Sequence, residues 1–278
     1  RNRMGGYFSN FSERKEAIIS LVVFFDLFDY PLTAYEIWQR TGRRWALSEI
    51  DAYLAKDLAL DLDNHLGFYC LPGRKDIIAV RQRRYNYSLS KVAKARRFAL
   101  IARLLPFVHS ISVANSIGAY NFRLESDIDL FVTSFPKRIW LARLFLAGIA
   151  KLLSLRPTPE NKRDKICLSF YAASNFHGWE ALKLAGGDPY FDCWQADLIP
   201  IYKKRKKPAV AHISWLDRAE EAAKAWQMKI MAPALKQAMN NSDGVVIGEG
   251  VIKLYLRDRR REFLDKLIIK TNALLSQA

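Results

Sequence analysis

The chain has 278 residues, of which 50% are hydrophobic and 13% aromatic, a composition that excludes a disordered protein and allows more than one core. Its formal net charge of +16 favours a polyanionic partner, such as nucleic acid or a nucleotide, although a basic surface without such a partner has the same composition. The three cysteines lie far apart in the sequence, which excludes a close CxxC zinc site and favours a reducing cytoplasm.

The chain shows no pattern typical of a targeting or membrane segment. The opening RNRMGGYFSN is basic and polar, and no signal-type cleavage site follows it. The window AIISLVVFF is too short to span a bilayer, and WLARLFLAGIAKLLSL carries Arg143 and Lys151. We therefore expect a cytoplasmic protein without a membrane partner, and the sequence leaves its oligomeric state open.

Residues 1–80 form the first predicted domain. Apolar residues at helical spacing predict helices over 12–28, 31–42 and 48–61, and LDLDNHLGFYCLPG with IIAVRQRR predicts a hairpin of short strands turning at 64–67. This order is that of a winged helix-turn-helix, which binds nucleic acid through its third helix. The third helix here is net acidic, so the alternative is a unit used for packing or protein contact.

The second predicted domain, residues 81–205, opens with the most basic stretch of the chain. Cations interleaved with tyrosines are typical of a surface that holds a phosphate backbone and stacks bases, and also of a helix with a solvated face. If the stretch binds nucleic acid, we favour RNA over DNA. We then expect the contacts to come from Arg81, Arg83, Arg84, Lys91, Lys94, Arg96 and Arg97.

The same domain continues with the segment that carries the candidate chemistry. VHSISVANSIG predicts a strand that ends in a small-residue turn, SDIDLFVTS a second strand, residues 136–155 a helix and KICLSFYAAS another strand. Residues 206–278 form a third predicted region of two long helices joined by residues 241–250.

Two carboxylates share one face of the second strand. Asp127 and Asp129 are two residues apart, so they project together while Ile128 and Leu130 face the core. Side-by-side carboxylates repel each other unless a cation intervenes, and Mg²⁺ prefers oxygen ligands completed by nucleotide phosphates. Ser116, in the preceding turn, is placed to offer its hydroxyl and backbone N–H to the same phosphates.

This constellation resembles the nucleotidyltransferase superfamily of DNA polymerase beta, marked by a small Gly-Ser turn and then Asp-hydrophobic-Asp on the next strand. FFDLFDYPLTAYEIW, GFYCLPGR and RDKICLSFY also resemble uncharacterised bacterial nucleotidyltransferase-like proteins with an N-terminal winged-helix region. The resemblance implies an α+β fold: a small mixed nucleotidyltransferase-type sheet with flanking helices, a winged-helix-like unit before it and a helical region after it.

The resemblance also implies the activity and its residues. It implies transfer of a nucleoside monophosphate from a nucleoside triphosphate to a hydroxyl of an RNA, protein or small molecule, with one or two Mg²⁺ ions. Asp127 and Asp129 would be the catalytic residues and metal ligands. The triphosphate would be held by Asn115, Ser116, Gly118 and Arg123.

Two departures from the family pattern keep an alternative open. Asn115 stands where the family has glycine, and the later strand carries no acid, since its central position is assigned to Ser169. Two other acids could supply the third carboxylate. Asp164 precedes that strand and would have to extend to the two aspartates, while Glu125 is expected in the turn before them. The alternative is a catalytically inactive nucleotidyltransferase-like module that binds nucleic acid, and a third reading is a structural subunit of an assembly.

Overall fold

The computed structural model describes residues 7–114, 117–204, 214–240 and 244–276. Its helices of six residues or more are α1 (Arg14–Asp26), α2 (Ala34–Arg40), α3 (Leu47–Lys56), α4 (Asp76–Ala99), α5 (Ile139–Leu152), α6 (Pro189–Ala196), α7 (Ser214–Ile230), α8 (Pro233–Ala238) and α9 (Arg260–Leu275). Short 3₁₀ turns occupy Tyr7–Ser9, Ile101–Leu104 and Glu180–Leu182.

The strands of the described chain form two sheets. They are β1 (Leu32–Thr33), β2 (Asp63–His65), β3 (Phe68–Cys70), β4 (Val108–Val113), β5 (Ile128–Ser134), β6 (Ile166–Ala173), β7 (Ile199–Lys203), β8 (Val245–Gly248) and β9 (Val251–Leu254). The small sheet has the order β1-β3-β2, and the large one the order β7-β4-β5-β6-β9-β8. Strands β5 and β6 are parallel while the other pairs of the large sheet are antiparallel, so the predicted mixed α+β architecture with flanking helices is confirmed.

The N-terminal unit contains α1 to α3 and the small sheet. Helix α1 is apolar on almost every side, which is typical of a helix enclosed by its neighbours, and residues 17–26 are buried. Helix α2 begins at a capping box, in which the Thr33 hydroxyl accepts from Glu36 N–H and the Glu36 carboxylate accepts from Thr33 N–H. The three predicted helices and the hairpin of β2 and β3 are confirmed, but the turn is shorter than the predicted 64–67, because Asn64 and His65 pair with β3.

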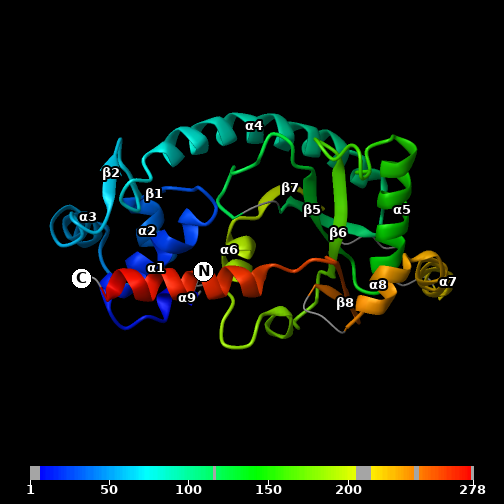
Figure 1. The fold of residues 1–278 in the computed structure, drawn as a ribbon. Helices are drawn as coiled ribbons and strands as arrows, with labels where there is room; N and C mark the ends of the chain where they lie inside the picture. Colours follow the sequence, from blue (N-terminus) through cyan, green and yellow to red (C-terminus); the bar gives the residue numbers. More distant parts are fainter. Residues whose placement is uncertain (1–6, 115–116, 205–213, 241–243, 277–278) are drawn as a thin grey trace.

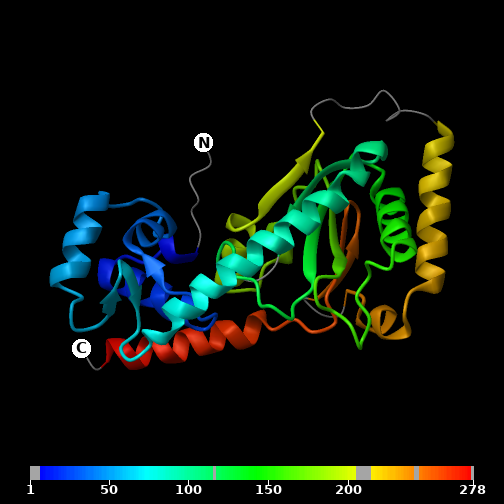
Figure 2. The ribbon, with the colours of Figure 1, turned by 90° about the horizontal axis from the view of Figure 1, so that it is seen from above.

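Two long helices connect this unit to the large sheet. In Figures 1 and 2, α4 crosses from the N-terminal unit to the large sheet along one side, and α9 returns along another to pack against α1. The prediction of a strand for IIAVRQRR was wrong, because these residues begin α4. The buried residues of α4 recur every three or four positions, as Ser88, Val92, Ala95 and Ala99 do. This helical spacing differs from the two-residue alternation of a strand.

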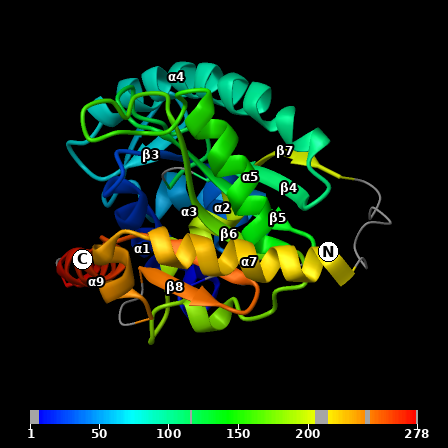
Figure 3. The same cartoon turned by 90° about the vertical axis from the view of Figure 1, so that its right-hand side faces the viewer.

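The C-terminal region supplies two strands of the large sheet. The prediction that 251–254 is helical was wrong: β9 pairs with β6, and β8 pairs with β9 across a turn in which Gly250 adopts φ +77°. A left-handed backbone suits glycine, and β-branched Val251 and Ile252 suit a buried strand. Figure 3 shows α7 and α5 at the end of the molecule that faces the viewer, and the two helices are in contact.

Two buried cores lie on the two faces of the large sheet. One joins Phe24 and Phe25 of α1 to Phe131 and Phe170 of the sheet and to Leu267 of α9. The other packs side chains of α4, α5 and α7 against Leu130 and Val132 of β5. Within the described ranges, none of the helices combines the length and apolar content that spanning a membrane requires.

Candidate functional site

The site is built on β5, whose side chains alternate between the two cores. Ile128, Leu130 and Val132 are buried on the α4 and α5 side, and Asp129 shares the opposite face with Phe131. Asp127, one residue before the strand, projects with Asp129, as the sequence predicts. Both aspartates are half-buried in the structure.

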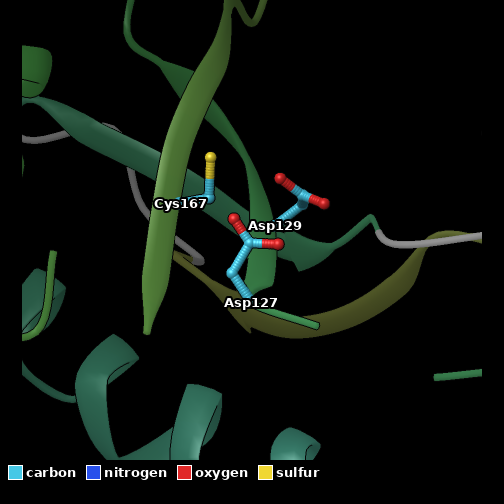
Figure 4. A group of neighbouring side chains, drawn as sticks. All are labelled: Asp127, Asp129 and Cys167. Atoms are coloured by element: carbon cyan, nitrogen blue, oxygen red, sulfur yellow. The ribbon is translucent and has the colours of Figure 1, made fainter. Parts of the chain in front are cut away.

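The residue that meets the two carboxylates from the neighbouring strand is Cys167. In the parallel ladder Asp129 is paired with Cys167, and the ligand atoms of Asp127, Asp129 and Cys167 all lie within 4.8 Å of one another. Figure 4 shows the Cys167 thiol beside both carboxylates. The assignment of this position to Ser169 was wrong; Ser169 lies two residues on, with its hydroxyl 3.3 Å from the Cys167 sulfur.

Burial and like charge dominate the electrostatics of this group. Burial, together with the neighbouring Asp127 carboxylate, raises the pKa of Asp129 to about 7. Burial also raises the pKa of Asp127, although Lys162 and Lys91 oppose the shift. Burial and the charge of Asp129 raise the pKa of the Cys167 thiol. The group therefore attracts a cation or protons.

A pocket of about 370 Å³ opens over the aspartates. Its lining includes aromatic residues that are far apart in the sequence: Phe28, Phe170, Tyr190, Phe191, Trp194, Tyr255 and Phe263. The lining also includes the cations Lys253, Arg257, Arg259 and Arg260. The sequence alone did not predict these residues, because α6, α9 and Phe28 meet β5 only in the folded chain.

The cations of the pocket differ in exposure. Lys253 is buried and lies 3.2 Å from an Asp258 oxygen, and Arg260 is held by Asp258 and Asp188. Burial and the nearby Arg260 lower the pKa of Lys253. Arg257 is exposed at the pocket. A triphosphate entering the pocket would therefore meet Arg257 without first breaking a buried ion pair.

The turn after β4 is hydrogen-bonded both to the N-terminal unit and to the segment after α6. Asn115 and Ser116 lie outside the described residues. Gly118 adopts φ +90°, and its N–H donates to Asp197 at 2.8 Å. The Tyr30 hydroxyl donates to the carbonyl oxygen of Ala119 at 3.3 Å, which links the turn to the N-terminal unit.

The other acids and the cation predicted near this site lie elsewhere. Arg123 is exposed, and the described residues that line the pocket do not include it. Glu125 is exposed and pairs with Arg163 at 3.7 Å. Asp164 does not reach in: it binds the ammonium groups of two lysines of α4 instead. The third member of the group around the two aspartates is thus a thiol rather than a carboxylate.

Part of the predicted basic surface is turned inward. Arg81 binds the Glu36 carboxylate, and Arg84 binds Asp29 at 2.9 Å. Lys91 is 1% exposed and donates to Asp164 at 2.9 Å and to the carbonyl oxygen of Ser126 at 2.6 Å. These three cations hold α4 to its neighbours.

The remaining cations of this stretch lie on the outer face of α4. Lys94 is partly exposed and pairs with Asp164. Three arginines are fully on the surface: Arg83, Arg96 and Arg97. A nucleic-acid surface on this helix would therefore be smaller than the sequence predicts.

No protein-family model, no curated protein and no solved structure matches this chain. The site therefore has to be interpreted from its own chemistry. The carboxylate oxygens of Asp127 and Asp129 fit Mg²⁺, a hard cation that binds one or two carboxylates and substrate phosphates. The Cys167 sulfur does not fit it, because thiolates bind softer metals.

Proposed function

We propose that this chain is a metal-dependent nucleotidyltransferase that moves a nucleoside monophosphate from a nucleoside triphosphate onto a hydroxyl of an RNA, protein or small molecule. The observation that carries the proposal is the pair Asp127 and Asp129, which face a pocket of about 370 Å³ with cations on its wall. The mixed sheet supports a nucleotidyltransferase-type fold, and three helices with a hairpin support a winged-helix N-terminal unit. The free cysteines support a reducing, cytoplasmic setting.

Each part of the site has a role in this reaction. Mg²⁺ bound with the triphosphate supplies charge neutralisation and alignment of the phosphates. Asp127 and Asp129 would hold it, and Arg257 would bind phosphate oxygens at the pocket mouth. The acceptor oxygen bonds to the α-phosphorus, the bond from that phosphorus to the bridging oxygen breaks, pyrophosphate leaves and the hydroxyl proton passes to solvent.

The aromatic residues of the pocket lining would bind the nucleoside. Trp194 stacks on Phe170 at 5.1 Å between ring centroids, and Tyr190 stacks on Phe263 at 5.7 Å. Rings that are held in place by each other lose little conformational freedom when a planar base packs on them. The acceptor would enter from the open side, beside Arg257.

Nucleotide binding is the first test. Thermal unfolding of the full chain with each of ATP, GTP, CTP and UTP, with and without Mg²⁺, should show a stabilisation of about 2.7 kcal/mol at 100 times the Kd. Asp127→Asn should abolish the Mg²⁺-dependent shift. Glu125→Gln removes an equal charge from an exposed residue two positions away. This variant should still show the Mg²⁺-dependent shift. Wild-type protein that none of the four nucleotides stabilises would refute a nucleotide site.

Transfer itself requires a second measurement. Protein incubated with α-labelled nucleotide, Mg²⁺ and total RNA or protein extract should form a labelled product that Asp127→Asn does not form. Binding without any labelled product would leave a nucleotide-binding protein and would overturn the transferase.

The second candidate is an inactive nucleic-acid-binding module. It is favoured by the outward-facing Arg83, Arg96 and Arg97 on α4 and by a thiol in place of a third carboxylate. It predicts RNA binding whose affinity falls steeply with salt, by roughly one unit of log–log slope per phosphate contact. Arg96→Gln with Arg97→Gln should reduce that slope by about 2, and Asp127→Asn should leave it unchanged.

A further inference from the structure

One cluster of side chains combines oxygen and sulfur donors, and its two aspartates line the pocket. Asp127 and Asp129 come from one strand and Cys167 from the strand beside it, with their ligand atoms all within 4.8 Å of one another. Figure 4 shows the thiol on the same side of the two strands as the carboxylates. All three residues are intermediate in burial.

This donor set suits a different ion from the one that a triphosphate carries. Mg²⁺ demands octahedral oxygen coordination and keeps several waters, whereas thiolates bind Zn²⁺ and its heavier analogue Cd²⁺. Catalytic zinc sites use three protein ligands and leave the fourth position to water or substrate. Two aspartates and one cysteine provide that number of ligands, and both aspartates line the pocket.

We propose that Asp127, Asp129 and Cys167 bind a thiophilic divalent cation of the zinc class, with its open coordination position directed into the pocket. The two carboxylates are those that the proposed function assigns to Mg²⁺, so the zinc-class ion would replace Mg²⁺ as the protein-bound metal of this site. Its use in nucleotidyl transfer rests on the proposed function, but its binding does not.

The arrangement needs only small adjustments to receive the ion. Tetrahedral zinc with bonds of about 2.0–2.3 Å has ligand atoms roughly 3.5 Å apart, so the three groups must draw together by about 1 Å. We expect rotation of the three short side chains to supply this approach. On binding, the thiol loses its proton to solvent, a sulfur–metal bond forms, and the metal neutralises the two adjacent carboxylates.

The chain contains matched controls for the thiol. Cys70 and Cys193 are also free, but both are buried away from this group, against Asp63 and Arg40 respectively. If Cys167 only packs, replacing it should have no more effect on metal binding than replacing either of these. If it is a ligand, its replacement alone should matter.

The experiment uses the full chain, stripped of metal and free of nucleotide. Zn²⁺ is titrated against a chromophoric chelator, and Cd²⁺ is titrated while the ultraviolet charge-transfer band of a cadmium–thiolate bond is recorded. We expect one tight Zn²⁺ site per chain, a Cd²⁺ band on the wild type, and no displacement of either ion by millimolar Mg²⁺. Cys167→Ala should weaken Zn²⁺ by about 100-fold and remove the band, Asp129→Asn should weaken Zn²⁺, and Cys70→Ala should change neither result.

Three results would overturn the proposal: no cadmium–thiolate band on the wild type, Zn²⁺ affinity unchanged by Cys167→Ala, or displacement of the ion by Mg²⁺. The first and third use the unaltered protein and do not depend on the folding of a variant. The test contains no nucleotide, so it separates the two proposals. Zn²⁺ binding through Cys167 without nucleotidyl transfer would refute only the transferase. Mg²⁺-dependent transfer by a protein without a zinc site would refute only the resident ion.

Discussion

The Arg40 guanidinium lies 2.5 Å from one carboxylate oxygen of Asp197, and the other oxygen of Asp197 accepts the Gly118 N–H at 2.8 Å. Arg40 belongs to α2 and Gly118 to the turn after β4, so a single carboxylate joins the N-terminal unit to the turn beside the candidate site. The Arg40 guanidinium also stacks over the Phe25 ring at 4.5 Å. The N-terminal unit is thus part of what fixes this turn.

Arg40→Met should destabilise the protein by about 3 kcal/mol, because Asp197 is 7% exposed and would keep a buried charge without its partner. Urea denaturation followed by circular dichroism measures this. Lys266→Met removes a cation from the exposed pair with Glu262 and should cost less than about 0.5 kcal/mol. Equal losses for the two variants would show that the Arg40 pair contributes no more than a surface pair.

Gly118→Ala should be among the most damaging single-methyl additions in the chain. The backbone has φ +90°, and a Cβ would lie 2.6 Å from a ring carbon of Tyr30, so we expect a loss of about 2–4 kcal/mol. Gly148→Ala adds the same methyl to an exposed position of α5 with nothing within 4 Å, and should stabilise by about 0.5–1 kcal/mol. The changes that the two variants make to the free energy of unfolding should differ in sign, and a loss under 1 kcal/mol for Gly118→Ala would contradict the clash.

The sequence was sufficient to predict the core of the site. In SDIDLFVTS, alternation along one strand is a local property, so the shared face of Asp127 and Asp129 follows from their spacing. The helices of the N-terminal unit follow in the same way from apolar spacing, and α2 also from its cap Thr33, whereas the expected caps Ser12 and Ser48 were wrong, because α1 begins after Glu13 and α3 after Ala46. Both are properties of short segments.

Pairing between strands is not a local property, and there the prediction failed. In the β5–β6 ladder the residue opposite Asp129 is Cys167 rather than Ser169, and this pairing is set between two strands that are far apart in the sequence. VIKL has too few residues to distinguish a strand from a helix turn, and its pairing with β6 decides the matter. The pocket walls come from Phe28, α6 and α9, whose meeting depends on the whole fold.

Stability should fall at low pH partly because of Asp164. Burial by itself would raise the pKa of this carboxyl, but hydrogen bonds from Lys94 and Lys91 outweigh it and hold the pKa below its ordinary value. A depressed pKa contributes stability that is complete above the unfolded value of about 3.9 and is lost as the pH falls through the lower folded value.

Asp164→Asn should therefore flatten the dependence of unfolding free energy on pH below about pH 4. It should also cost about 3 kcal/mol at pH 7, because Lys91 is 1% exposed and loses its counter-ion. Urea titrations from pH 2 to pH 7 measure both. Glu125→Gln, which removes an exposed acid paired at 3.7 Å, should leave the profile of the wild type, and an Asp164→Asn profile as steep as wild type would assign the acid sensitivity elsewhere.

Asp129→Asn should stabilise the metal-free protein while it removes the site. Two half-buried carboxylates side by side repel each other and lose hydration, so neutralising one should raise the unfolding free energy in EDTA by about 1–2 kcal/mol. Asp258→Asn is the matched control in the same pocket: Asp258 binds Lys253 and Arg260, so its neutralisation should destabilise. Denaturation at pH 8 measures both. Destabilisation by Asp129→Asn would mean that its charge is compensated within the protein, and would remove the electrostatic reason for a cation there.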